Sequence, residues 1–400
     1  MAVVGGRGTG APLVRRAEEG DRAAIGWLGA EAFAPSSAPA PDISSIDLGV
    51  HWVAEVDGSV VGTAAGHPLG QWFGGRLLGS TAVRSVAVAT THRGKGLSSL
   101  LMGALMRDAR DRGDALSLLY PSVPAPYRRL GYELAGDHQV LCVSVAALPS
   151  AKGPEVVSIT GDDLAEVRTC YDSAARGTAG ALERTQRWWR ELVLSRPGTY
   201  GLAVREDGVV TGYVWFTKER RTDADLPYYF DVEVRDAAAT TPRATAALLG
   251  ALRAQAGLGL DARWRGRVGD AWCRAVDGVV PRVAMSYPWM LRILDVPAAL
   301  AGRGYPPGAS LDLVLGVDDA VLPENAGGFR LVVRGGTAVV DRSDDEPDVS
   351  LRVGDLASLF TGYVTARELA SESRLAGSLE GLAGLDAAFA GPRPCLSEMF

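Results

Sequence analysis

Cysteine and histidine are scarce in this 400-residue chain, and the few present are not arranged as metal ligands. The four cysteines lie far apart and form no C-x-x-C pair, so neither a zinc site nor a disulfide framework is expected. The four histidines show no H-x-H or H-x-x-x-H spacing, and we predict no bound metal. Free thiols fit a reducing compartment, which favours a cytoplasmic location.

The sequence also lacks an uninterrupted apolar run long enough to span a membrane. Its first ten residues are glycine-rich and lack the apolar core of a signal peptide. The 41 basic residues are outnumbered by 47 acidic ones, giving a net charge of −6, and no basic stripe stands out. We therefore predict that neither a membrane nor a nucleic acid is the partner.

Hydrophobic residues make up 47% of the chain, enough to bury two or three cores. In the first unit, residues 1–150, strand and helix patterns alternate, which predicts an α/β fold. Strands are expected at 13–16, 52–56, 60–64, 77–89 and 116–120, with a D-G turn joining the second and third. Asp21 is expected to cap a helix that carries Ile25, Leu28 and Phe33, and a loop follows at 34–42.

The second unit, residues 151–290, repeats this order. It has a strand–turn–strand at 199–217 with its own D-G turn, a strand at 230–235 and a helix from Thr241. The third unit, residues 291–400, contains a glycine- and proline-rich link at 302–308. It shows four strand patterns between 311 and 353 and helical patterns at 355–360 and 382–390.

The most informative stretch is 90–113, which begins where the strand at 77–89 ends. Apolar residues recur there at steps of three and four, from Leu97 to Ala109, and predict an amphipathic helix. The R-G-K-G run at 93–96 therefore lies at a strand-to-helix junction. Free N–H groups, the helix dipole and small glycines make such a junction a natural anion site. A strand–turn–helix without any ligand is the alternative.

The anion motif is neither a G-x-x-x-x-G-K-[ST] loop nor a G-x-G-x-x-G fingerprint. It resembles the pyrophosphate loop of the GNAT superfamily of N-acetyltransferases, [Q/R]-x-x-G-x-[G/A], and implies acetyl-CoA as co-substrate. Here the motif positions are Arg93, Gly96 and Ser98, with serine in place of the last small residue. The second unit lacks the R-G-x-G run, so we interpret it as a degenerate copy that cannot hold the cofactor.

The whole chain resembles the Eis (enhanced intracellular survival) family of bacterial acetyltransferases. The resemblance rests on the motifs at 85–97 and 127–132, the W-W pair at 188–189, the L-D-V-P-A-A-L run at 294–300 and the terminal phenylalanine. It implies two GNAT-like domains in tandem, the second inactive, followed by a sterol-carrier-protein-like α/β domain. It also implies a homo-oligomer, often a hexamer, that acetylates primary amines, including those of aminoglycosides and lysine side chains in some members.

Carried over residue by residue, the resemblance implies that Tyr127 is the general acid and that the terminal carboxylate of Phe400 is the general base. A tyrosine, with an ordinary pKa of about 10, is protonated at neutral pH, but Tyr120 and Tyr132 compete with Tyr127 on sequence alone. A terminal carboxylate needs burial to raise its pKa enough to act as a base. The residues implied to hold acetyl-CoA are Val86, Ala87, Val88, Arg93, Gly94, Lys95, Gly96, Leu97 and Ser98.

The amine site is expected near the helix and loop at 31–42. The candidate substrate-binding residues are Glu31, Phe33, Ser85 and Glu398, with Asp42 as a further acid. Relatives that acetylate aminoglycosides often carry an aromatic residue at the position of Ser85, so the acceptor class stays open between aminoglycosides, polyamines and lysyl peptides. Two other functions remain: a carrier of an apolar ligand in the third unit, and a structural oligomer.

Overall fold

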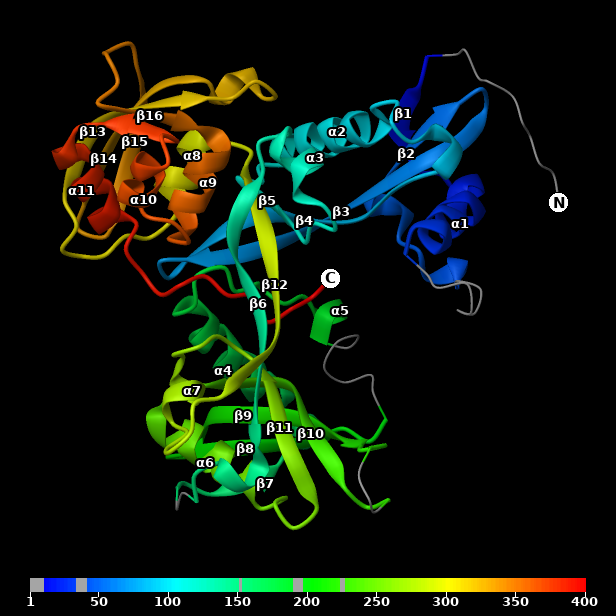
Figure 1. Ribbon diagram of the computed structural model, residues 1–400, viewed down its shortest axis with the longest axis vertical. Helices are drawn as coiled ribbons and strands as arrows, with labels where there is room; N and C mark the ends of the chain where they lie inside the picture. Colours follow the sequence, from blue (N-terminus) through cyan, green and yellow to red (C-terminus); the bar gives the residue numbers. More distant parts are fainter. Residues whose placement is uncertain (1–10, 34–41, 151–152, 190–196, 224–226) are drawn as a thin grey trace.

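The computed structural model describes residues 11–33, 42–150, 153–189, 197–223 and 227–400 (Figure 1). The predicted loop at 34–42 lies outside these residues, except for Asp42. The described strands form a twelve-stranded sheet, to which the first two units contribute, and a five-stranded sheet in the third unit. The tandem α/β fold class predicted from the sequence is confirmed.

The first half of the large sheet contains the predicted strands in the predicted order. Its Asp57–Gly58 turn has positive φ at both residues, 51° and 75°, which a two-residue hairpin turn requires. The elements of this half are β1 (Leu13–Arg16), β2 (His51–Val56), β3 (Ser59–Phe73), β4 (Arg76–Val88), β5 (Leu116–Leu119) and β6 (Glu133–Ser144), with helices α1 (Arg22–Phe33), α2 (Leu97–Asp111) and α3 (Pro124–Arg128).

Helix α2 forms as its apolar period predicts. Leu97, Leu101, Leu105 and Ala109 are buried against the sheet, whereas Leu100, counted in the same apolar face, is 45% exposed. Asp21 does not cap α1 as predicted: it ends the 3₁₀ turn Glu19–Asp21, which runs directly into α1. Its carboxylate accepts from the N–H of Glu18 at 2.8 Å, in a capping box at the start of this turn, and from the guanidinium of Arg15 at 2.7 Å.

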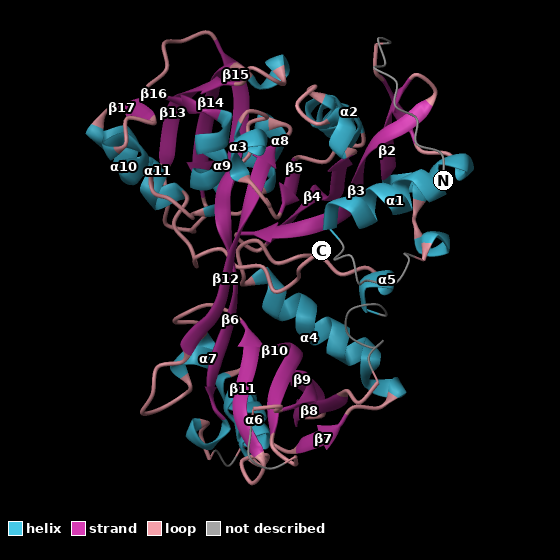
Figure 2. Cartoon of the chain, turned by 45° about the vertical axis from the view of Figure 1, so that its right-hand side comes forward, coloured by secondary structure: helices cyan, strands magenta, loops and turns pink. Residues whose placement is uncertain are grey.

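The second half repeats the pattern with helices on both faces of its strands. Alternate residues of one strand enter different cores: Tyr213 and Trp215 pack with α4, whereas Val214 and Phe216 pack with α6. Figure 2 shows these two helices against the strands of this half. The elements are β7 (Val156–Ser158), α4 (Leu164–Arg176), α5 (Gln186–Trp188), β8 (Tyr200–Glu206), β9 (Val209–Arg220), β10 (Phe230–Ala239), α6 (Pro242–Arg253), β11 (Gly259–Arg265), α7 (Ala271–Arg274) and β12 (Arg282–Ile293).

The two halves exchange their last strands. The order across the sheet is β1-β2-β3-β4-β5-β12-β6-β11-β10-β9-β8-β7. Strand β12, from the end of the second unit, pairs with β5 of the first, and β6, from the first unit, pairs with β11 of the second. Figure 1 shows β6 and β12 running side by side between the halves. The predicted boundaries at 150 and 290 therefore divide the chain but not the sheet.

The third unit has a sheet of order β15-β14-β13-β16-β17, covered by helices. Its elements are α8 (Val296–Gly302), β13 (Leu311–Asp318), β14 (Gly327–Arg334), β15 (Thr337–Ser343), β16 (Val349–Arg352), α9 (Val353–Thr361), α10 (Ala366–Ser371), β17 (Leu375–Gly377) and α11 (Leu379–Ala388). From α11 the chain runs back to the large sheet, and its end lies near α5 (Figure 1).

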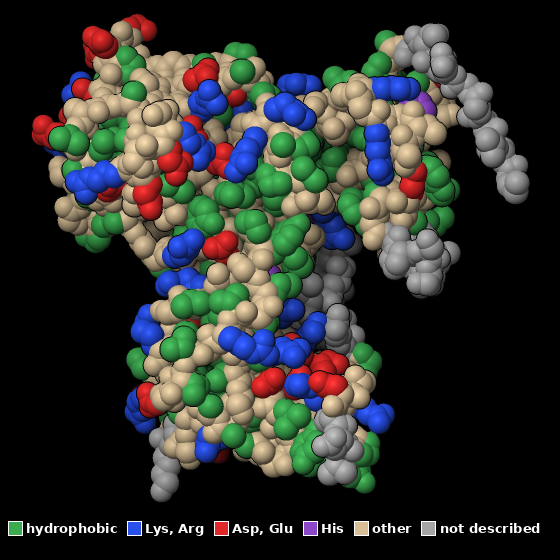
Figure 3. Space-filling model, in the orientation of Figure 1, with side chains coloured by type: hydrophobic (Ala, Val, Ile, Leu, Met, Phe, Trp, Pro, Cys, Tyr) green, Lys and Arg blue, Asp and Glu red, His purple; other side chains and the backbone are tan. Residues whose placement is uncertain are grey.

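Basic and acidic side chains are interspersed on the face shown in Figure 3, in keeping with the absence of a basic stripe in the sequence. Within the described residues, no helix combines the length and apolar character needed to cross a bilayer.

Candidate active site

The predicted anion site is an uncapped helix start. Helix α2 begins at Leu97, and its N-cap residue, Gly96, has φ +78° and makes no side-chain capping bond. Gly94 has φ +77°, and a Cβ at either glycine would meet nothing within 4 Å, so backbone conformation rather than space calls for glycine here. The N–H groups of Leu97 and Ser98 have no partner among the described residues and can bind an anion.

Two basic residues flank this helix start. The Nε of Arg93 donates to the carbonyl oxygen of Val88 at 3.2 Å, which ties the loop to the end of β4. Lys95 is exposed beside the two glycines. The loop therefore combines open main-chain donors with positive charge.

The sheet is split next to this loop. Strand β4 pairs in parallel with β5 only from Ser80 to Val83, opposite Leu116 to Leu119, and then continues to Val88 paired with β3 but not with β5. Ser85, with φ +55°, lies at the irregularity that follows. Main-chain groups of β4 beyond Val83, including those of Val86 and Val88, have no β5 partner. An extended ligand can add there as a strand would.

A pocket of about 240 Å³ lies at this split and brings several predicted residues together. Both predicted catalytic residues line it, as do the candidates Phe33, Ser85 and Val86. Its lining is Phe33, Val83, Arg84, Ser85, Val86, Leu119, Tyr120, Ser122, Tyr127 and Phe400.

Hydrogen bonds separate the three competing tyrosines. The Tyr120 hydroxyl donates to the main-chain oxygen of Glu398 at 2.6 Å, and the Tyr132 hydroxyl bonds to Ser117 at 2.7 Å. The Tyr127 hydroxyl has no partner among the described residues, and burial raises the pKa of Tyr127, which keeps its proton in place. Tyr127 is thus the tyrosine whose hydroxyl is available to a ligand in this pocket.

The chain end is held in the pocket by aromatic contacts. The ring of Phe400 lies 5.2 Å from that of Tyr120 and 6.1 Å from that of Trp188, between centroids. The terminal carboxylate has no ion-pair partner among the described residues. Trp189 is 3% exposed and packs on Tyr171, as expected of a packing residue.

A second cavity of about 400 Å³ adjoins this pocket and shares Phe33, Arg84 and Ser85 with it. It is also lined by Asp42, Asp47, His51 and His67. Burial, reinforced by the charge of Arg84, lowers the pKa of His51 to about 4. Asp47 and His51 were not predicted as site residues, because an isolated acid in a loop and a histidine at the start of a strand belong to no motif.

Two predicted amine ligands lie elsewhere. The carboxylate of Glu31 accepts from the N–H of Thr90 at 3.2 Å, in the β4–α2 loop, and lines neither cavity. Glu398 is 5% exposed, and its Oε1 lies 2.6 Å from the guanidinium of Arg184. Because that cation already holds the carboxylate, Glu398 is not available as a substrate ligand.

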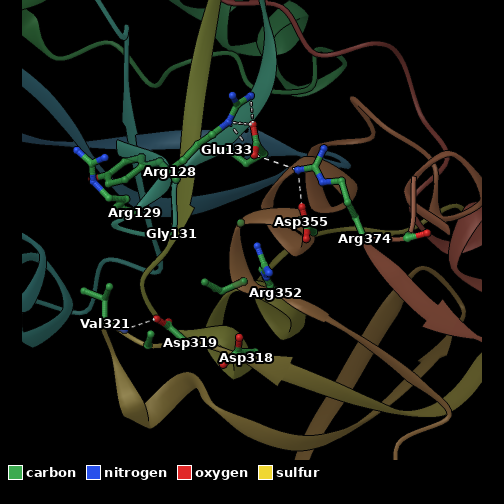
Figure 4. Close-up of a pocket in the computed structure, with 15 residues that line it drawn as sticks. Arg128, Arg129, Gly131, Glu133, Asp318, Asp319, Val321, Arg352, Asp355 and Arg374 are labelled. Carbon is green, nitrogen blue, oxygen red and sulfur yellow. Dashed lines mark hydrogen bonds and ion pairs between the residues drawn. The ribbon is translucent and has the colours of Figure 1, made fainter. Parts of the chain in front are cut away.

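A larger cavity, about 720 Å³, lies between the first and third units (Figure 4). Figure 4 shows Glu133 between Arg128 and Arg374, and its carboxylate bonds to both, at 2.8 and 3.0 Å. The lining of this cavity includes neither Tyr127 nor Phe400, so we do not place the chemistry there. Among the described residues, no group of three or more potential ligands is placed to hold a metal.

Family comparisons agree with the division of the chain into two acetyltransferase-like units and a third unit. Models of an acetyltransferase (GNAT) domain match residues 14–135 and 180–293, and a model of a sterol carrier protein domain matches residues 296–397. An uncharacterized N-acetyltransferase from Streptomyces coelicolor is 29% identical, over 91% of this chain and 92% of its own length. N-acetyltransferase Eis from Mycobacterium tuberculosis is 30% identical, over 80% of each chain.

Solved structures show the same architecture. A GCN5-related N-acetyltransferase from Kribbella flavida has a TM-score of 0.87 at 25% identity, over 98% of each chain. Eis1 from Mycobacterium abscessus has a TM-score of 0.82 at 23% identity, over 98% of this chain and 100% of that one. The chain is therefore an N-acetyltransferase with two GNAT domains and a sterol carrier protein domain. It belongs to the Eis family, as its sequence motifs predicted.

Proposed function

We propose that this enzyme transfers the acetyl group of acetyl-CoA to a primary amine of a small molecule or peptide. The observation that carries the proposal is the meeting of Tyr127 and Phe400 in one pocket at the split between β4 and β5. The residues that would hold the pyrophosphate are those of the open helix start, with Arg93 and Lys95 beside them. Main-chain groups of Val86 and Val88 would bond to the pantetheine arm, and Ala87 lies between them.

The chemistry needs three things: a neutral amine, a stabilised oxyanion and a proton for the leaving thiolate. The carboxylate of Phe400 takes a proton from the amine, directly or through water, and the amine nitrogen attacks the thioester carbon. A main-chain N–H near Val88 donates to the oxyanion. The C–N bond forms, the C–S bond breaks, and Tyr127 gives its proton to the sulfur.

The adjoining cavity is the best place for the rest of the acceptor. Its two loop carboxylates, Asp42 and Asp47, favour a cationic molecule, while Phe33 and Ser85 lie where the two cavities meet. This supports polyamines, aminoglycoside-like amines and lysine side chains as acceptor classes. The family resemblance supports a homo-oligomer, with a hexamer as the expected form, and the four buried cysteines support a cytoplasmic location.

The alternative of an apolar-ligand carrier has less support. The core of the third unit is filled by fully buried side chains, including Phe329 and Phe360. Arg303, 4% exposed, is buried beside three aromatic rings, at 5.0 Å from Tyr305, 5.0 Å from Phe360 and 4.7 Å from Phe389. A buried cation makes this interior unsuited to a sterol.

The proposal is tested by changing the two catalytic groups separately. Tyr127→Phe should lower kcat by roughly 10²-fold or more while acetyl-CoA affinity, measured by calorimetry, stays unchanged, because the ring remains and only the proton donor is lost. Adding Gly-Ser after Phe400 should lower kcat similarly by moving the carboxylate, and the same dipeptide at the N-terminus is the control. Full turnover in either variant would remove that group from the mechanism.

A further inference from the structure

The C-terminal tail follows a defined path between the two halves of the large sheet. The N–H of Leu396 donates to the carbonyl of Asp137 in β6 at 3.1 Å, and the N–H of Asp137 donates to Pro394 at 3.4 Å. The Nδ1 of His138 lies 2.9 Å from the carbonyl oxygen of Leu396. These bonds place the tail on β6 but end four residues before the terminal carboxylate.

The next contacts are made by Glu398, whose main-chain oxygen accepts from the Tyr120 hydroxyl at 2.6 Å and whose side chain enters a buried charge cluster in the second unit. Arg184 binds Asp236 through two bonds of 2.7 and 2.8 Å and binds Glu398 of the tail at 2.6 Å. The side chains of Arg184 and Glu398 are each 4% exposed. The hydroxyl of Tyr213 donates to Asp236 at 2.7 Å, and that of Tyr171 lies 3.1 Å from Glu398.

One cation therefore serves two buried carboxylates. The Arg184 guanidinium also lies 3.7 Å from the centre of the Tyr171 ring, which covers it from solvent. If the cation were removed, Asp236 and Glu398 would face each other uncompensated. Asp236 is fixed in β10, whereas Glu398 is near a chain end and can move to water. Phe400, two residues further on, would move with it.

This cluster lies at the split of the second half. Strand β10 pairs with β11 only up to Glu233 and then continues to Ala239. A cavity of about 320 Å³ at this split is lined by Ala237, Ala238 and Ala239 on one side and by Cys395, Ser397 and Glu398 of the tail on another. The tail thus borders the position in the second half that corresponds to the place proposed for the cofactor arm in the first half.

We propose that the second acetyltransferase-like unit acts as the receptor for the C-terminal tail, and that Arg184 is the positioning residue that holds the carboxylate of Phe400 beside Tyr127. The proposal rests on the proposed function, since it takes that carboxylate as the base. It gives the degenerate unit a task in catalysis without any contact with the cofactor.

Arg184→Ala in the full-length enzyme tests the proposal. It should lower kcat about tenfold or more, leave the KM for acetyl-CoA unchanged, and speed the release of Phe400 by a carboxypeptidase. Arg205→Ala, which breaks partly buried ion pairs with Asp163 and Glu166 in the same unit, is the matched control and should change none of these. Unchanged kcat and unchanged release of Phe400 in a folded Arg184→Ala enzyme would overturn the proposal.

Glu398→Gln removes the charge while keeping the side-chain length, and it replaces Arg184→Ala if that variant fails to fold. It should change kcat and Phe400 release in the same direction, to a smaller extent. The double variant should be no worse in kcat than Arg184→Ala, because both changes act through the tail. Additive losses would mean that Arg184 acts through Asp236 instead. If the Gly-Ser extension keeps full turnover, the base role of Phe400 fails, whereas carboxypeptidase release still decides whether Arg184 holds the tail.

Discussion

The two halves of the large sheet carry the same strand–helix unit, but their helix starts differ. In the first half, α2 starts after Gly96 with open N–H groups and no side-chain cap. In the second, α6 starts with Thr241, whose Oγ1 accepts from the N–H of Ala244 at 3.0 Å, and with Pro242, which has no N–H to offer. The first helix start is open to an external anion, and the second is not.

The second half also supplies an anion of its own. The carboxylate of Glu206 in β8 accepts from the hydroxyls of Thr241 and Thr211, at 2.6 and 2.7 Å. It lies 3.6 Å from Arg243 in the first turn of α6. A negative charge at a helix N-terminus stabilises the helix. A GNAT fold therefore does not require an open helix start, because an internal carboxylate can take the favourable electrostatic position that a phosphate would take.

The largest effect is expected from placing a carboxylate at the helix start of the first half, as Glu206 does in the second half. Ser98→Glu puts a carboxylate in the first turn of α2, so it should weaken acetyl-CoA binding roughly 100-fold or more, about 3 kcal/mol, by repelling the pyrophosphate. The fold should be kept, because an acidic residue there favours the helix dipole. Calorimetric titration and thermal unfolding measure the two effects. Ser98→Gln, similar in size and uncharged, is the control, and equal affinities for the two variants would contradict an anion site at this helix.

A second difference lies at the first residue of matching strands, His51 in β2 and Tyr200 in β8. His51 is 7% exposed and bonds to Thr63 at 3.1 Å, whereas the ring of Tyr200 stacks on Phe216 and is 50% exposed. The first half thus has a buried titratable group at the proposed acceptor cavity, and the second half has an aromatic ring in its place.

His51 predicts a pH dependence of stability. An unfolded histidine gains its proton near pH 6.5, but His51 in the folded chain does so only near pH 4. Between these values the unfolded state binds more protons, so the free energy of unfolding should fall by roughly 3 kcal/mol as the pH drops through this window. Denaturant unfolding of wild type and His51→Gln measures it. His51→Gln should lose most of this pH dependence, and the control His92→Gln should keep it. If the free energy of unfolding changed with pH equally in all three proteins, His51 would not be its source.

The smallest effect is expected from removing the internal anion of the second half. Glu206→Gln should lower the thermal unfolding temperature slightly and leave kcat and acetyl-CoA affinity unchanged. The hydroxyls of Thr241 and Thr211 lower the pKa of Glu206, so its contribution is present above the ordinary carboxyl pKa and is lost on acidification below it. The difference between the variant and wild type should therefore shrink at acidic pH. Glu219→Gln, which breaks a similar bond to Thr217 away from the helix start, is the control. A fall in the acetyl-CoA affinity of Glu206→Gln would show that the second half affects cofactor binding in the first.

Local features of the chain were predictable because they depend on neighbouring residues. The hairpin turn at 57–58, the amphipathic α2 and the glycines before it follow from rules of turns, helix periods and helix starts. The sequence predicted no strands at β6, β11 and β12, and it predicted Asp21 as the N-cap of α1, although Asp21 belongs to the capping box of the 3₁₀ turn before that helix. It named Tyr127 and Phe400 by resemblance, without a physical means of separating Tyr127 from Tyr120 and Tyr132.

The sequence by itself determined the order of the three units, the open helix start at Gly96 and the lack of such a start in the second unit, since each is written in a short run of residues. Only the tertiary structure decided that β6 and β12 change halves, that Glu398 pairs with Arg184, and that the chain end lies beside Tyr127. The reason is physical. These contacts join residues far apart in the chain, and their stability depends on burial and charge compensation that exist only once the units have packed together.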